Sequence, residues 1–436
     1  MVLTNANATP ADNATVLGMI QAFRAAAAAG RRGEADQLLT RVAQLAPSHP
    51  AVLNELGLVM MQRGEHGRAR ELFERATNTD PNHPSLWSNL AASLRALNLP
   101  EELEAIERAL KLEPRHLASL LQKGQYIEQR GDARNAARMY RNALATLRPG
   151  ETPPDTVTEA LRHAREVIAR DDAELAGAIE QRLAPLRAQH PDASSRRVER
   201  CVEHLTGRRG RFHQQPTFMY FPELPAVEFF ERRDFPWLDA VEAATDEIRE
   251  ELMSVLISDR EGLQPYVAFP EGSPVNQWRE LNKSRRWSAY FLWNQGEPQP
   301  AHLARCPRTA EVLRQVPQVE IERRAPTAYF SILEPGTRIP PHTGVTNTRA
   351  IVHVPLVVPA QCGFRVGSEI REWVPGEAWV FDDSIEHEAW NLSDSPRAIL
   401  IFDVWNPYLS AAERDMVRAA TEVVVSHYQL PPQGPA

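Results

Sequence analysis

A repeat of about 34 residues runs through the first third of the chain and limits the possible folds more than any other feature. The repeat is marked by prolines that lie 34, 33 and 35 residues apart, namely Pro47, Pro81, Pro114 and Pro149. Small residues such as Gly57 and Gly124 recur at one position of the unit, and Phe73 and Tyr140 follow at another. Small residues let two antiparallel helices approach closely, an aromatic ring fills the gap, and proline ends the second helix. The pattern therefore predicts stacked helical pairs over residues 16–150.

The spacing and the placement of the small residues resemble those of tetratricopeptide repeats. Three units are clear, and residues 16–47 form a weaker one before them. The resemblance implies a helical solenoid whose concave surface binds a peptide or protein partner, because stacked pairs generally expose a groove. A helical cap on the next domain is the alternative. We expect a flexible N-terminus at residues 1–15 and a helical bridge at 151–210, where the repeat proline is missing.

The second half of the chain has a different period. After one amphipathic helix from about Trp237 to Leu256, short strand-like runs alternate with turns rich in Gly, Pro, Asp and Ser. The runs cover residues 287–293, 327–333, 349–358, 363–367, 371–375, 377–383, 386–393 and 397–405. They predict a double-sheet jelly roll, with a tight hairpin at the "PGE" between Trp373 and Trp379. The fold class is thus α+β multidomain, with helical repeats, a double-stranded β-helix domain at 211–425 and a tail at 426–436.

Composition and charge restrict the class of protein further. The chain has 436 residues, of which 43% are hydrophobic and 24% charged, as is usual for globular proteins. The net charge of −8 argues against a nucleic-acid-binding surface. No run approaches the roughly 20 apolar residues of a membrane span, and the start lacks the pattern of a secretory signal. Three cysteines without a CxxC pair indicate reduced thiols, so we expect a cytoplasmic protein without membrane or nucleic-acid partners.

Three histidines of the β region, His342, His353 and His387, are candidate metal ligands. Two histidines and one carboxylate with open coordination positions are typical of non-haem Fe(II) oxygenases. In the usual pattern the carboxylate follows the first histidine by two residues, and the second histidine comes later on a returning strand. His342 and His387 are 45 residues apart, but Gly344 takes the carboxylate position. The neighbours Asp382 and Asp383 could supply the carboxylate instead; a role in capping the turn or in orienting His387 is favoured.

Charged residues near these histidines indicate a site for an acidic ligand. Arg397 opens the strand that follows His387, and a buried guanidinium there suits bidentate binding of a carboxylate. In "RAIVHVPL", the alternation of a strand puts Arg349, Ile351 and His353 on one face, as expected for an interior that holds a charged ligand. The alternatives are a core role for His353 and a surface charge at the strand end for Arg349.

Two longer segments, "FSILEPGTRIPPHTGVTNTRAIVHVPL" and "GEAWVFDDSIEHEAWNLSDSPRAILIFDVWNP", resemble the aspartyl/asparaginyl β-hydroxylase family. These are Fe(II)- and 2-oxoglutarate-dependent oxygenases with a double-stranded β-helix core, and the similar spacing runs from about 216 to 410. The resemblance implies that His342 and His387 hold the iron, with water in the position that Gly344 leaves open. It also implies contacts to 2-oxoglutarate from Ser331, His353 and Arg397. The family often has a second arginine where this chain has Ile351.

The resemblance predicts a dioxygenase that hydroxylates the β-carbon of an aspartyl or asparaginyl residue in a peptide or protein, with His342, His387 and Arg397 as its catalytic set. Arg349 is the first candidate for the substrate carboxylate, and Arg285 and Arg286 are secondary ones. The repeats could bind the substrate or another protein. Three alternatives remain open: the same cofactor chemistry on a small metabolite or biosynthetic peptide, a halogenase with a halide on the iron, and a non-catalytic repeat scaffold with a degenerate oxygenase domain.

Overall fold

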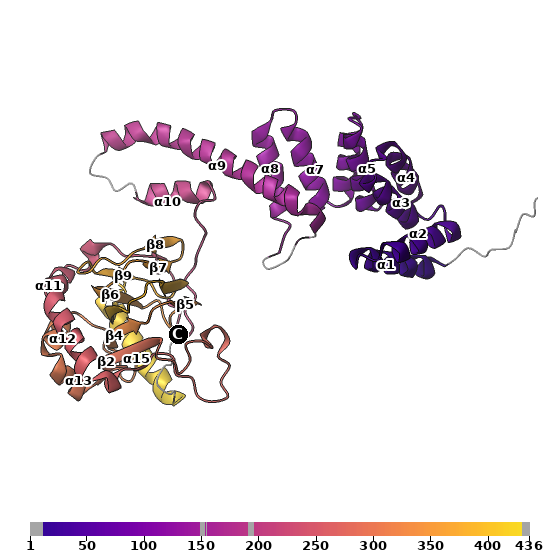
Figure 1. Cartoon of the computed structure of the whole chain (residues 1–436). Helices are drawn as coiled ribbons and strands as arrows, with labels where there is room; N and C mark the ends of the chain where they lie inside the picture. Colours follow the sequence, from indigo (N-terminus) through magenta and orange to yellow (C-terminus); the bar gives the residue numbers. More distant parts are fainter. Residues whose placement is uncertain (1–11, 149–152, 154, 191–195, 430–436) are drawn as a thin grey trace, which may run out of the picture. The chain divides into compact units, whose positions relative to one another are not determined.

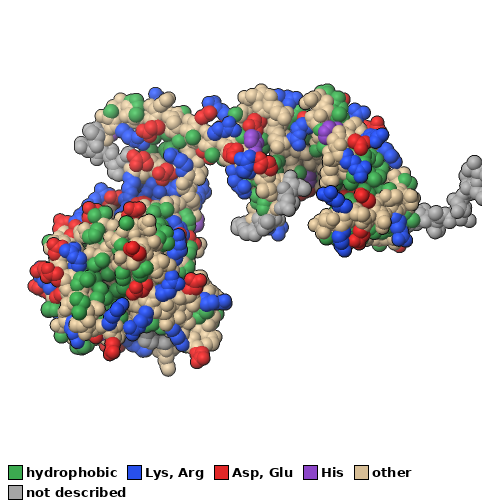
Figure 2. All heavy atoms as spheres, viewed as in Figure 1, with side chains coloured by type: hydrophobic (Ala, Val, Ile, Leu, Met, Phe, Trp, Pro, Cys, Tyr) green, Lys and Arg blue, Asp and Glu red, His purple; other side chains and the backbone are tan. Residues whose placement is uncertain are grey.

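The computed structural model describes residues 12–148, 153, 155–190 and 196–429. The chain forms two compact units that divide between Gly207 and Arg208. Figure 2 shows acidic and basic side chains intermixed on the visible face of each unit. No helix of the described residues combines the length and the apolar character that a membrane crossing requires.

The first unit consists of the predicted helical pairs (Figure 1). Its helices are α1 (Asn13–Ala28), α2 (Arg32–Leu45), α3 (Pro50–Gln62), α4 (His66–Thr79), α5 (Pro84–Ala96), α6 (Glu102–Leu112), α7 (Leu117–Glu128), α8 (Ala133–Leu144), α9 (Asp155–Gln189) and α10 (Arg196–Leu205). The weaker unit at 16–47 also forms a pair, and α1 starts at Asn13 behind the cap residue Asp12. The flexible segment expected at residues 1–15 therefore overlaps the first residues of α1. Residues 1–11 lie outside the described residues.

Close contact between paired helices explains the repeating small residues. A Cβ atom on Gly57 would lie 2.5 Å from Cε1 of Phe73, and one on Gly124 would lie 2.4 Å from Cε1 of Tyr140. Both rings are fully buried. Helix α9 adds Leu161 to the hydrophobic cluster around Tyr140. The first half of the expected bridge thus continues the core of the repeats.

The second unit contains two antiparallel sheets, as predicted for a jelly roll. The strands are β1 (Gln264–Pro265), β2 (Trp287–Asn294), β3 (Glu297–Pro298), β4 (Ala328–Leu333), β5 (Thr337–His342), β6 (Arg349–Val357), β7 (Cys362–Val366), β8 (Glu369–Arg371), β9 (Trp379–Phe381), β10 (His387–Asn391) and β11 (Arg397–Trp405). The seven-stranded sheet has the order β1-β2-β4-β11-β6-β9, with β3 paired to β2, and the four-stranded sheet has the order β5-β10-β7-β8. One hydrophobic cluster joins their inner faces, for example Ile399 and Ile401 with Phe364 and Ala389.

Helices cover the outer face of the seven-stranded sheet (Figure 1). They are α11 (Leu238–Ala243), α12 (Thr245–Ser258), α13 (Pro300–Arg305) and α14 (Pro307–Gln315). The single helix expected at 237–256 is divided at Ala244 into α11 and α12, which pack separately against the sheet. Helix α15 (Ala411–His427) continues past residue 425, so the first residues of the expected tail are helical.

Three strand predictions need correction. Strand β5 was not expected because it contains Pro340 and Pro341, but β5 is an edge strand, where proline costs no ladder hydrogen bond. Strand β8 ends at Arg371 rather than spanning 371–375, since the chain turns Trp373 into the interior. The turn at Gly376 is not a hairpin, because β8 pairs with β7 whereas β9 pairs with β6. That turn therefore carries the chain from one sheet to the other.

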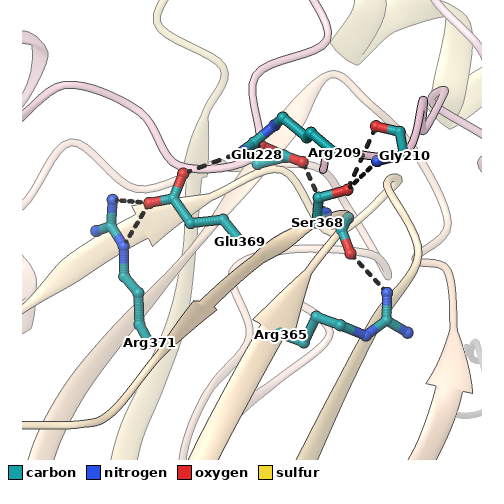
Figure 3. A network of polar contacts seen from close by, with 8 residues as sticks. Arg209, Gly210, Glu228, Arg365, Ser368, Glu369 and Arg371 are labelled. Carbon is teal, nitrogen blue, oxygen red and sulfur yellow. Dashed lines mark hydrogen bonds and ion pairs between the residues drawn. The ribbon is translucent and has the colours of Figure 1, made fainter. Parts of the chain in front are cut away.

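Polar contacts fix the start of the second unit to the four-stranded sheet (Figure 3). Arg209 forms ion pairs with Glu228 and Glu369, and the backbone N–H of Gly210 donates to Oγ of Ser368 at 3.0 Å. Further along the same segment, the N–H of Gln215 donates to the carbonyl of Ser384 at 2.7 Å, and that of Thr217 donates to the carbonyl of Gly344 at 3.0 Å. The segment thereby supports both loops that carry the predicted site.

Candidate active site

A cavity of about 630 Å³ opens between the two sheets. This volume is in the range of small-molecule sites in proteins. The lining includes all five residues predicted for metal or 2-oxoglutarate binding and three further positions that the sequence singles out, namely Ser331, His342, Gly344, Arg349, Ile351, His353, His387 and Arg397. Sequence positions up to 66 residues apart thus meet at one place.

The two candidate metal ligands face each other across a strand pair. His342 ends β5 and His387 begins β10, the two are register partners, and their ring centroids are 4.0 Å apart. Nδ1 of His342 lies 2.8 Å from the carbonyl oxygen of Pro340, and Nδ1 of His387 lies 3.0 Å from that of Ile385. An Nδ1–H that donates to a carbonyl leaves the lone pair on Nε2.

The protonation state of both rings also suits a metal. Burial lowers the pKa of His342 to about 4 and holds the pKa of His387 well below its usual value. Both imidazoles are therefore neutral near pH 7, and neutral imidazole is the ligating form. The pair fits a divalent ion such as Fe(II). Among the described residues, no set of three or more His, Cys, Asp or Glu side chains is arranged to hold a metal.

Asp383 occupies the space beside Gly344. A Cβ atom on Gly344 would lie 2.0 Å from Oδ2 of Asp383, and the N–H of Gly344 donates to the carbonyl of Asp383 at 2.6 Å. Burial raises the pKa of Asp383 to about 7, and its Oδ1 has no hydrogen-bond partner within the described residues. Asp382 caps the turn as expected, because its Oδ1 accepts from the backbone N–H and the hydroxyl of Ser384. Position 344 therefore has no room for a side chain while Asp383 is present.

We expect Gly344→Asp to damage the site rather than to complete a ligand triad. The new carboxylate would overlap the carboxyl group of Asp383, and such overpacking costs about 1–3 kcal/mol. The metal-free variant should melt at a lower temperature and bind Fe(II) more weakly than the wild type. The double variant Gly344→Asp/Asp383→Gly removes the overlap and should regain most of the lost stability. An unchanged melting temperature in the single variant would contradict this prediction.

Arg397 is the charged side chain with the least exposure to solvent in this cavity. It is 1% exposed, and no described residue forms an ion pair with it. Nη1 of Arg397 donates to the carbonyl and to Oγ of Ser331, both at 3.3 Å, while Nε has no hydrogen-bond partner among the described residues. The guanidinium lies over the ring of Trp373 at 4.8 Å, and burial lowers its pKa to about 10. A buried cation without a carboxylate partner is matched to an anionic ligand.

Ser331 and His353 lie beside Arg397 with free hydrogen-bonding capacity toward the cavity. Oγ of Ser331 accepts from Nε1 of Trp287 at 3.1 Å and from Arg397, so its own hydrogen is available for a ligand. Nδ1 of His353 accepts from Nε1 of Trp373 at 3.4 Å, which leaves an N–H at Nε2. Burial, together with the charge of Arg397, holds the pKa of His353 well below its usual value. These groups can donate to the same carboxylate as Arg397.

The predicted substrate residues differ in their positions. Arg349 lines the cavity, and its Nη1 lies 2.8 Å from Oδ2 of Asp403. Arg285 and Arg286 are exposed and are not among the residues that line the cavity, so the structure does not support them as site residues. Arg286 instead donates to the carbonyl of Gly336 at 2.7 Å, at the turn between β4 and β5.

Two charged residues of the cavity were not predicted. Asp403 lies within the otherwise apolar run "RAILIFDVW". Because burying a carboxylate is costly, its position in this run could have indicated a functional residue. Arg324 lies before β4 and is 4% exposed, but the adjacent Arg323 gives it no distinct sequence signal. An aromatic wall was also missed, in which Tyr266 stacks on Trp287 with ring centroids 4.1 Å apart.

The fold and the cavity together define a class of protein. It has an array of helical repeats followed by a jelly-roll domain, and the cavity of that domain combines two neutral histidines with a buried arginine. Residues 242–407 match the family described as "Aspartyl/Asparaginyl beta-hydroxylase", and residues 26–94 match "Tetratricopeptide repeat". The C-terminal part of the chain is therefore a domain of the aspartyl/asparaginyl β-hydroxylase family, a family of 2-oxoglutarate oxygenases, and it follows N-terminal tetratricopeptide repeats.

Relatives of this domain have different names. "Aspartate beta-hydroxylase domain-containing protein 2" of Xenopus tropicalis is 33% identical over 46% of this chain and 53% of its own length. "Aspartyl/asparaginyl beta-hydroxylase" of Homo sapiens is 39% identical over 31% of this chain and 18% of its own length. "Ornithine lipid ester-linked acyl 2-hydroxylase" of Rhizobium tropici is 31% identical over 42% of this chain and 62% of its own length. Each match covers less than two thirds of the relative.

Proposed function

We propose that the C-terminal domain is an Fe(II)- and 2-oxoglutarate-dependent dioxygenase that hydroxylates the β-carbon of an aspartyl or asparaginyl residue in a peptide or protein. The observation that carries this proposal is the buried guanidinium of Arg397, which forms no ion pair with any described residue and lies in the same cavity as two neutral, register-paired histidines. A small dicarboxylate that chelates a metal at one end needs both features at once.

The proposal assigns a role to each predicted metal or 2-oxoglutarate ligand in the cavity. Nε2 of His342 and Nε2 of His387 hold the metal, and the carboxyl of Asp383 lies beside Gly344 next to them. Arg397 binds the distal carboxylate of 2-oxoglutarate, assisted by donors from Ser331 and His353. When bound, Fe(II) and 2-oxoglutarate supply the oxidising chemistry that hydroxylates an unactivated carbon. The aromatic wall formed by Tyr266 and its neighbours excludes water from that side of the cavity.

A polypeptide substrate is supported by the repeat unit. The odd-numbered helices contact one another from unit to unit, as the inner row of a solenoid does. On them Nδ2 of Asn89 donates to Oδ1 of Asn54 at 2.7 Å, and Oγ of Ser88 donates to Oε1 of Gln122 at 3.1 Å. These contacts place polar side chains of α3, α5 and α7 in one row. These contacts hold the row of odd-numbered helices together, and we propose that the face formed by this row binds the substrate or a protein partner.

The proposed compartment is the cytoplasm. Its support is chemical: the three cysteines Cys201, Cys306 and Cys362 are all free thiols. Reduced thiols are usual in the cytosol.

The proposed activity is tested by succinate formation. Purified protein with Fe(II), 2-oxoglutarate and oxygen would be incubated with Asp- or Asn-containing peptides, with the free amino acids, or with vesicles of an ester-linked acyl lipid. We expect peptides alone to stimulate succinate formation and to gain the mass of one oxygen atom. Stimulation only by the lipid or the free amino acids would overturn the choice of substrate. A product that gains chlorine in chloride buffer would indicate a halogenase, and no stimulation by any compound would indicate a degenerate domain.

A further inference from the structure

Besides Arg397, four charged side chains line the cavity: Arg324, Arg349, Asp383 and Asp403. Their formal charges cancel. The carboxyl group of Asp403 is ion-paired with Arg349, and the carboxyl group of Asp383 lines the same cavity. With the charge of Arg397 matched by the distal carboxylate of 2-oxoglutarate, these four groups give no net attraction to an anionic side chain.

The central element of this group is the ion pair of Arg349 and Asp403. Nη1 of Arg349 lies 2.8 Å from Oδ2 of Asp403, and the side chains are 12% and 3% exposed. Oδ1 of Asp403 accepts from the backbone N–H of Thr327 at 3.0 Å, which holds the carboxylate in place. Arg349 uses the same Nη1 for the carbonyl of Arg324 at 3.3 Å. Nη1 of Arg349 therefore donates both hydrogen bonds that this side chain makes to described residues. The N–H groups at Nε and Nη2 remain for a ligand.

An acceptor without a partner lines the same cavity as these donors. Oδ1 of Asp383 is buried and has no hydrogen-bond partner within the described residues, as noted above. A carboxamide offers one acceptor oxygen and two N–H donors, whereas an ionised carboxylate offers acceptors only. A carboxamide can therefore accept from Arg349 and donate to Asp383. A carboxylate in the same place would face the carboxylate of Asp403, and an ionised carboxylate has no hydrogen to donate to Oδ1 of Asp383.

The neighbour of Arg349 on this face of β6 also favours a carboxamide over a carboxylate. Ile351 lines the cavity and contributes no hydrogen-bond donor and no positive charge. We infer that the domain selects an asparaginyl over an aspartyl side chain, with the Arg349–Asp403 pair as the element that determines this specificity. The inference rests on the proposed function and names the substrate of that same site.

A matched pair of peptides tests this inference. The peptides differ only in Asn or Asp at the target residue, and kcat/KM is measured for each from succinate formation and the mass of the hydroxylated product. We expect the Asn peptide to be preferred by at least about tenfold, which corresponds to about 1.4 kcal/mol. Equal turnover, or a preference for the Asp peptide, would overturn the inference and leave the proposed function standing. Failure of both peptides to stimulate succinate formation would overturn both.

Two variants extend the test to the residues concerned. Asp403→Asn removes the negative charge but keeps an oxygen for the N–H of Thr327, and Ile351→Arg adds a cation to the same face. Each should shift the ratio of kcat/KM values toward the Asp peptide by about tenfold or more, mainly through KM. The control Asp394→Asn changes an exposed carboxylate outside the cavity and should leave the ratio unchanged. A ratio that stays constant in both cavity variants would contradict the assignment to the Arg349–Asp403 pair.

Discussion

Replacing His387 with alanine is expected to abolish Fe(II) binding while the metal-free protein stays folded. The site offers two imidazole ligands, so the variant retains one. Removal of a residue that only supports a metal ligand already costs about 10–100-fold in affinity, and loss of a ligand should cost more than about 100-fold. Stability should change little, because the side chain lines an existing cavity and its lost hydrogen bond to Ile385 contributes about 1 kcal/mol.

The measurement is a calorimetric titration of metal-free protein with Fe(II) under anaerobic conditions, together with thermal denaturation. His302→Ala is the matched control, since His302 lies in the same domain, stacks on Tyr290 and bonds the carbonyl of Phe291 through Nδ1. That variant should lose some thermal stability and bind the metal as the wild type does. Wild-type affinity in His387→Ala would overturn the assignment of the metal site.

Replacing Arg397 with methionine should change ligand binding and stability in opposite directions. Loss of a buried charge partner costs about 2–5 kcal/mol, so the affinity for 2-oxoglutarate should fall by about 30-fold to several thousand-fold. Without the ligand, Arg397 is a buried cation for which no described residue provides an ion-pair partner, and burial lowers its pKa to about 10. An apolar side chain of similar length removes that desolvation cost, so the ligand-free variant should melt at the same or a higher temperature.

Calorimetric titration with 2-oxoglutarate and thermal denaturation of ligand-free protein measure the two effects. Arg371→Met is the control, because Arg371 forms an ion pair with Glu369 and lies 3.8 Å from the ring centroid of Phe229. This control should melt at a lower temperature and bind 2-oxoglutarate normally. If Arg397→Met were destabilised with its affinity intact, Arg397 would be a structural residue and the proposed cofactor site would be wrong.

Much of the architecture could be predicted from local patterns. The repeat spacing predicts helical pairs because each unit must bury the same face, and the contact of Gly124 with Tyr140 follows from that spacing. Alternation along β6 puts Arg349, Ile351 and His353 on one face, and all three line the cavity. These predictions succeed because they concern neighbours along one element.

Other features depend on contacts between distant elements. Strand β5 contains two prolines and forms because it lies at a sheet edge. Arg286 is adjacent to β2 in sequence but points to the turn at Gly336, away from the cavity. The pairing of Arg349 with Asp403 depends on the register of β6 and β11, in which Ile351 is the partner of Asp403.

The sequence by itself determined the helical repeats, the jelly roll and the residues proposed to bind metal and 2-oxoglutarate, because periodicity and motif spacing are local properties. Only the tertiary structure decided what surrounds those residues. It placed Asp383 against Gly344, left Arg397 without an ion-pair partner among the described residues and paired Arg349 with Asp403. The physical reason is that strand register and sheet packing, rather than distance along the chain, determine which charges meet in a buried site.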